Sequence, residues 1–173
     1  TGDVTLTADR DIRLDAANVD ILTGGAGAIS LSATTGTIFM TDGSTLVSED
    51  GDIALFAETD IDVSLIESNN GDLSLEAETG AIRDNTLAED ANLVTSGTAT
   101  LKAATGIGSN ATPEADLITR VANLSALNTT SGNIILSDED GFTVVDDGVE
   151  NQAVSGDIRM LVQAGTLGVD APV

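Results

Sequence analysis

A repeated pattern constrains the fold of this chain more than any other feature of its sequence. The segment GDLSLEAETGAI at 71–82 has a near-copy, GDIALFAETDI, at 51–61. A glycine followed by apolar residues two and four positions later recurs at seven starting points, namely Gly2, Gly27, Gly51, Gly71, Gly97, Gly132 and Gly156. These starts lie 20 to 35 residues apart, a spacing typical of solenoid proteins built from stacked repeats.

Each repeat contains short apolar segments separated by turn residues. The first alternates apolar and polar residues, as Leu73 and Leu75 do, which predicts a strand with one buried face. A glycine or aspartate nine positions after the start, such as Gly80, predicts a tight corner, because glycine tolerates positive φ and aspartate bonds the local backbone. We expect second strands at 11–14, 37–40, 60–63 and 142–145, and third segments at 18–21, 44–47, 64–66, 92–94 and 123–127.

One repeat of this length cannot bury its own apolar face. Stacking the repeats as successive turns places equivalent side chains above one another in a continuous core. The sequence therefore predicts an all-β parallel β-helix of about seven turns, with three short strands per turn, over residues 1–173 as a single domain. A sandwich of antiparallel hairpins would share the alternation but would not need a repeat with a fixed internal offset.

One irregular insertion is expected around residues 109–121, inside the longest interval between starts. Thr112 is suited to cap a helical turn that begins at Pro113, with Glu114 and Asp116 near the positive helix start. The alternative is a surface loop that enters a strand at 117–121. Both alternatives place a bulge in the cross-section of the solenoid.

Charge and composition argue against several classes of function. With a net charge of −23 and six basic residues, the chain is unsuited to binding nucleic acid or an anionic membrane. It has no His or Cys, which removes the usual nucleophilic and zinc sites. It also has no Tyr or Trp to serve as a platform for the sugar rings of a glycosidase substrate. We therefore expect no enzymatic activity, no required cofactor and no membrane insertion.

The candidate binding residues are acidic side chains at the corners. Asp52 and Asp72 occupy the same position in successive repeats, where unit charges about 4.8 Å apart repel by roughly 0.9 kcal/mol in water. Calcium prefers carboxylate and carbonyl oxygens, so Ca²⁺ is the candidate ion. No acidic stretch completes an EF-hand or a calcium-binding nonapeptide, and a solvated acidic face is the alternative. The candidate ligands are Glu49, Asp50, Asp52, Asp72, Asp138 and Asp140.

Several long segments carry a resemblance to a known family: GDVTLTADRDIRLDAANVDI at 2–21, GAISLSATTGTI at 27–38, GTATLKAATGIGS at 97–109 and ATGIGSNATPEADLITRVANLSALNTTSGNIIL at 104–136. In these segments the chain resembles the repeat regions of filamentous haemagglutinin-like bacterial exoproteins and giant surface adhesins. The resemblance implies a right-handed parallel β-helix that forms the shaft of a long secreted rod and carries no catalytic residues.

The resemblance and the acidic corners lead to two expectations about function. The first is a structural shaft segment, outside the cell or on the bacterial cell surface, that presents loops for adhesion, aggregation or biofilm matrix. Neither end of the sequence looks like a polar cap, so neighbouring repeats or other copies stacked head to tail are the expected partners, together with cell-surface or matrix glycans. The second is a calcium-binding β-solenoid module that is stabilised by, or assembles through, Ca²⁺ at its acidic corners.

Overall fold

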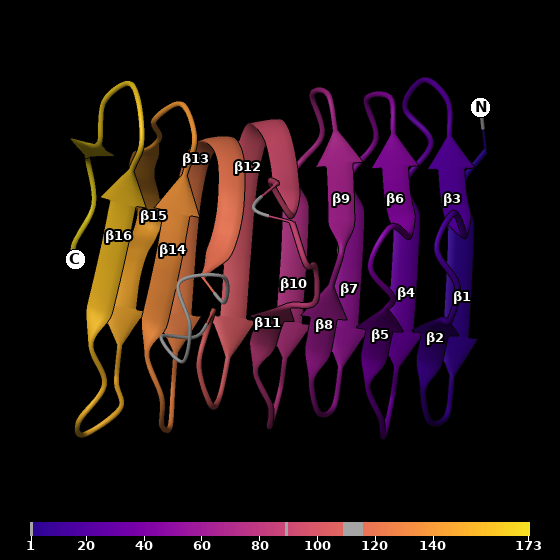
Figure 1. Cartoon of the computed structure of the whole chain (residues 1–173), viewed down its shortest axis with the longest axis horizontal. Coiled ribbons are helices and arrows are strands. Elements are labelled where there is room, and N and C mark those ends of the chain that lie inside the picture. Colours follow the sequence, from indigo (N-terminus) through magenta and orange to yellow (C-terminus); the bar gives the residue numbers. More distant parts are fainter. Residues whose placement is uncertain (1, 89, 109–115) are drawn as a thin grey trace.

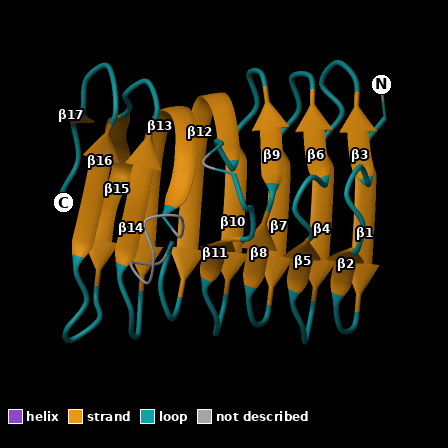
Figure 2. Ribbon diagram, in the orientation of Figure 1, coloured by secondary structure: helices purple, strands orange, loops and turns teal. Residues whose placement is uncertain are grey.

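The computed structural model describes residues 2–88, 90–108 and 116–173, and this part of the chain contains strands and no helix. Parallel strands stack as a β-solenoid of about seven turns, which confirms the predicted fold (Figures 1 and 2). The turns follow one another along the long axis of the molecule in chain order (Figure 1). None of the described segments forms the long apolar helix that would span a bilayer.

Three columns of stacked strands build the first four turns. The first column contains β1 (Val4–Ala8), β4 (Ile29–Ala33), β7 (Ile53–Ala57) and β10 (Leu73–Ala77). The second contains β2 (Ile12–Leu14), β5 (Ile38–Met40), β8 (Ile61–Val63) and β11 (Ile82–Asp84). The third begins with β3 (Asp20–Thr23), β6 (Thr45–Ser48) and β9 (Leu65–Ser68).

Later strands pass from one column into the next. The start of β12 (Leu93–Ala103) pairs with β9 in the third column, and its end pairs with β10 in the first. The long strand β13 (Leu117–Asn128) follows β12 along both columns. β14 (Ile134–Asp138) and β16 (Ile158–Val162) then run through the second and third columns, whereas β15 (Thr143–Asn151) and β17 (Gly168–Val169) continue the first.

Aliphatic ladders form the core. Leu31, Leu55, Leu75 and Leu101 stand one above another in the first column, and each is at most 2% exposed. Because side chains alternate between the two faces of a strand, a slip of one residue between turns would move this whole set to the surface. The apolar alternation therefore sets the register of the stack.

The predicted phase of the repeat is correct for the first five starts and wrong for the last two. Ile134, after Gly132, pairs with Ile107, which pairs with Ile82, so this segment lies in the second column and not in the first. Ile158, after Gly156, pairs with Ile134 and shares the shift. Glycine followed by alternating apolar residues describes any strand that leaves a corner, and it does not tell which column that strand joins.

The predicted columns of the segments on either side of Gly132 are also wrong. The predicted third segment 123–127 pairs with Thr98–Lys102 in the first column, and Leu124 stacks on Ala99. The predicted second strand 142–145 falls in β15, where Val144 pairs with Leu124. Ala99, Leu124 and Val144 therefore occupy equivalent positions in three successive turns of the first column. The 35 residues between Gly97 and Gly132 do not form one long turn, because Gly132 begins a strand of a different column.

The expected insertion at 109–121 divides into two parts. Thr112, Pro113 and Glu114 lie outside the described residues. The segment 117–121 belongs to β13, as the alternative of a loop entering a strand predicted. Asp116 precedes this strand and is buried.

Replacing Leu75 by alanine should strongly destabilise the fold. Leu75 is 1% exposed between Leu55 and Leu101, so the change removes buried apolar atoms and leaves a cavity. We expect the free energy of unfolding, measured by urea titration, to fall by about 2–5 kcal/mol. Leu6→Ala is the matched control, because Leu6 has the same position in the outermost turn but is 41% exposed. Equal losses for the two variants would contradict the ladder core.

Candidate functional site

All six predicted calcium ligands lie along one edge of the solenoid. We call this edge the upper corner; it joins the third column to the first and lies at the top of Figure 1. Glu49, Asp50 and Asp52 lie between β6 and β7, and Asp72 lies between β9 and β10. Asp138 ends β14 and Asp140 follows it. The structure thus brings the predicted residues to one edge, in two groups on different turns.

Asp52 and Asp72 each accept a hydrogen bond from the backbone of the next turn. Asp52 Oδ1 accepts from the N–H of Asp72 at 2.9 Å, and Asp72 Oδ1 accepts from the N–H of Thr98 at 2.8 Å. Asp3 binds Ala28 in the same way in the first turn, at 3.0 Å. These carboxylates link consecutive turns where the chain leaves the regular strand ladder.

Neutral and acidic side chains both serve this linking role. At the opposite corner, between β13 and β14, Asn133 Oδ1 accepts from the N–H of Asp157 at 2.9 Å, so an amide does the same work there. At that same corner, in an earlier turn, Asp60 Oδ1 accepts from the N–H of Ala81 at 2.9 Å. The shared requirement is an acceptor oxygen on a short side chain, and a negative charge is not essential to it.

Glu49 and Asp50 also make contacts between turns. Glu49 Oε2 accepts from the N–H of Gly25 at 2.7 Å, which links the second turn back to the first. Asp50 Oδ1 accepts from Asn70 Nδ2 at 2.5 Å, which links it forward to the third. These two residues, like Asp52 and Asp72, therefore have structural partners on neighbouring turns.

Asp138 is a buried carboxylate that is surrounded by donors. It is 0% exposed, and its Oδ1 accepts from the N–H groups of Gly141 at 2.6 Å and Asp140 at 3.2 Å. Its Oδ2 accepts from Thr119 Oγ1 at 2.8 Å and from the N–H of Val121 at 3.4 Å. These bonds compensate the burial of the carboxylate and shape the corner that leads into β15.

The acidic charge of the upper corner is only partly neutralised. Within the described part of the chain, none of the six predicted residues forms an ion pair. Lys102, in contrast, donates to Glu76 Oε1 at 2.5 Å on the face of the first column, and this bond lowers the pKa of the Glu76 carboxyl. No group of three or more potential metal-ligating side chains occurs among the described residues.

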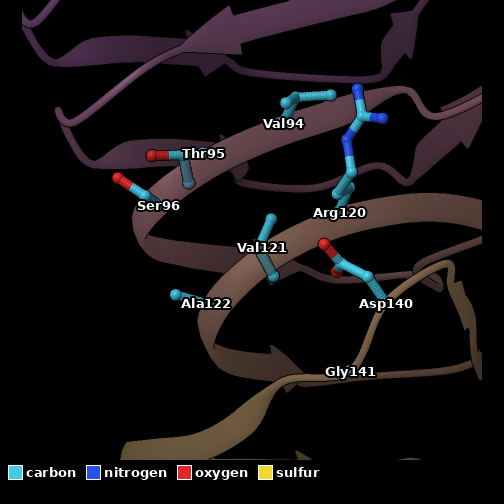
Figure 3. A pocket seen from close by; sticks show the side chains of 8 residues that line it. All are labelled: Val94, Thr95, Ser96, Arg120, Val121, Ala122, Asp140 and Gly141. Atoms are coloured by element: carbon cyan, nitrogen blue, oxygen red, sulfur yellow. The ribbon is translucent and has the colours of Figure 1, made fainter. Parts of the chain in front are cut away.

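A hollow interrupts the upper corner between the two acidic groups. Two residues, Ser96 and Gly97, form the corner in β12, whereas Ala122 alone forms it in β13, so the chain recedes at that turn. The resulting hollow of about 360 Å³ has Arg120 and Asp140 among its lining side chains (Figure 3). Because the hollow contains a guanidinium, it is a poor site for a metal cation.

The sequence did not predict a partly buried polar cluster on the side of the second and third columns. Asp84 Oδ1 accepts from the N–H and Oγ1 of Thr86 and from Asn92 Nδ2, each at 2.7 Å. Burial raises the pKa of Asp84, and the nearby charge of Asp116 adds to this rise. Asp84, Thr86 and Asn92 lie in one turn, in a stretch without strand alternation, and the charge of Asp116 reaches them from the next turn, so the repeat pattern does not reveal the cluster.

Comparison of the chain with family models, curated proteins and solved structures gave no match. The fold and the geometry of the corners therefore carry the functional argument. The resemblance to haemagglutinin-like exoproteins stays a prediction from the sequence.

Asp72→Asn should leave stability nearly unchanged, whereas Asp72→Ala should lower the free energy of unfolding by about 1 kcal/mol. Asparagine keeps an acceptor for the N–H of Thr98, and alanine removes it. Asp140→Ala is the control, since the Asp140 carboxylate accepts no hydrogen bond from the described residues. Urea titration gives the three values.

The same variants distinguish a hydrogen-bond acceptor from a calcium ligand. If Asp72 holds an ion, calcium will raise the melting temperature of the wild type above that of an equal-ionic-strength control, and Asp72→Asn will reduce this gain. That outcome would contradict a purely structural role for the carboxylate.

Asp84→Asn should stabilise the protein at neutral pH. The pKa of Asp84 is raised above its ordinary value of 3.8 in the folded state, so its contribution is most favourable below that value and is lost as pH rises through the folded pKa. Asparagine retains an acceptor oxygen and removes the repulsion from Asp116. Urea titrations should show a gain at pH 7 that disappears near pH 3. A gain no larger than that of the exposed control Asp140→Asn would contradict this.

Proposed function

We propose that this chain is a shaft segment of an extracellular or cell-surface bacterial adhesin or filament. The main support is the use of its polar corner side chains: Asp52, Asp72 and Asp50 bind neighbouring turns. Side chains that bond one turn to the next stabilise an elongated stack of turns, as a shaft requires. The work of the segment is then to span distance and to present its loops.

The outermost turn supports stacking on neighbouring repeats or on other copies. Leu6 in β1 is 41% exposed, whereas Leu31, its partner one turn inward, is 1% exposed. Ile21 in β3 is only half-buried, whereas Leu46, its partner one turn inward, is 0% exposed. A further turn placed against β1 and β3 would bury both side chains and pair the open strand edges.

Calcium binding at the upper corner is the second candidate. It is favoured by the stacking of Asp52 and Asp72, whose charges have no cationic side chain paired with them in the described residues. A carboxylate has two oxygens, so accepting one backbone N–H leaves the other available to an ion. In this version the ion would strengthen the same contacts between turns.

The location of the segment tests the proposal. Antibodies raised against the folded chain should label the surface of intact cells of the source bacterium by immunogold microscopy, and protease added outside should remove the signal. A cytoplasmic protein followed in the same samples controls for cell lysis. Labelling that appears only after the cells are broken would overturn the shaft proposal.

A further inference from the structure

The upper corner contains a chemically labile dipeptide, Asn70–Gly71. An asparagine side chain followed by glycine is prone to intramolecular attack, because the glycine N–H carries no neighbouring side chain to hinder it. Asn70 is exposed at the corner, between β9 and β10. The corner therefore presents the amide group to solvent.

Both halves of this dipeptide are held by hydrogen bonds. The N–H of Gly71 donates to Oγ of the buried Ser68 at 2.9 Å, and the same hydroxyl donates to the carbonyl of Gly51 at 2.9 Å. Asn70 Nδ2 donates to Asp50 Oδ1 at 2.5 Å, and Ser96 Oγ donates to Asn70 Oδ1 at 3.2 Å. The nucleophilic nitrogen and the amide it would attack are thus tied to different partners.

The same protection recurs at other corners. The N–H of Gly51, after Asp50, donates to Ser48 Oγ at 2.8 Å. The N–H of Gly141, after Asp140, donates to Asp138 Oδ1 at 2.6 Å. At each of these corners a side-chain oxygen accepts the hydrogen bond of the glycine N–H. The contact between Ser68 and Gly71 is therefore one instance of a repeated feature of the corners.

We propose that Asn70 is a site of spontaneous deamidation whose rate is set by Ser68. In this reaction the Gly71 nitrogen loses its proton and attacks Cγ of Asn70. The Cγ–Nδ2 bond breaks, ammonia leaves with that proton, and a five-membered succinimide forms. Water then opens either ring carbonyl, which yields aspartate or the β-linked isoaspartate. The Ser68 hydroxyl slows the first step because it holds the N–H away from Cγ.

The product changes a contact between turns. The amide that donates to Asp50 becomes a carboxylate facing a carboxylate, so a hydrogen bond is replaced by repulsion. The isoaspartate form also lengthens the backbone next to Gly71, where even an added Cβ would collide with the carbonyl oxygen of Gly51. Modification at Asn70 therefore loosens the stacking of the third turn on the second.

Peptide mapping by mass spectrometry tests the proposal. The folded chain is incubated at mildly alkaline pH, and aspartate and isoaspartate at position 70 are quantified over time. Ser68→Ala should speed the reaction about two- to tenfold, the factor that corresponds to losing one such hydrogen bond. The urea-unfolded chain should react faster still.

Two variants separate the hydroxyl contact from general loss of stability. Ser68→Thr keeps the hydroxyl, as Thr95 does for Gly97 in the next turn, and should keep the wild-type rate. Ser48→Ala removes the equivalent contact one turn earlier and should leave the rate at Asn70 unchanged. A wild-type rate in Ser68→Ala, or equal acceleration in Ser48→Ala, would overturn the role assigned to Ser68. No reaction at Asn70 in the unfolded chain would overturn the site itself.

Discussion

The structure depends on the parallel pairing of each turn with the next in a fixed register. Equivalent residues meet across this pairing, so Leu31, Leu55 and Leu75 form one buried ladder. The backbone bonds hold the turns at a spacing of about 4.8 Å, and the aliphatic ladders make any slip in register costly. Every other feature of the molecule, including its acidic corners, is arranged around this stacking.

The corners are the places where the regular pairing is interrupted, and the acidic side chains compensate for this. A corner leaves backbone N–H groups that the strand ladder does not satisfy. Asp52 and Asp72 supply acceptors to these groups from one turn away, and Asn133 does so without a charge. Part of the net charge of −23 thus belongs to side chains with a structural purpose.

This arrangement connects the proposed function with the chemistry of the corner. A shaft must resist separation of its turns, and the polar contacts at the corners add to the core in doing so. The need for contacts between turns also brings Asp50 and Asn70 together at this corner. Gly71 follows Asn70 because the close approach of the neighbouring turn leaves no room for a side chain there. The contact that tightens the corner therefore includes a labile amide, and Ser68 lies where it restrains that amide.

The sequence by itself determined the strands, the corners and the class of fold. Alternation at Leu73, Leu75 and Ala77 specifies a buried face locally, and its repetition leaves stacking as the way to cover that face. Only the tertiary structure decided that Ile134 joins the second column, that Asp138 is buried and that Asn70 contacts Asp50. These outcomes depend on how many residues each corner uses, as at Ala122, and therefore on contacts between turns that a local pattern does not contain.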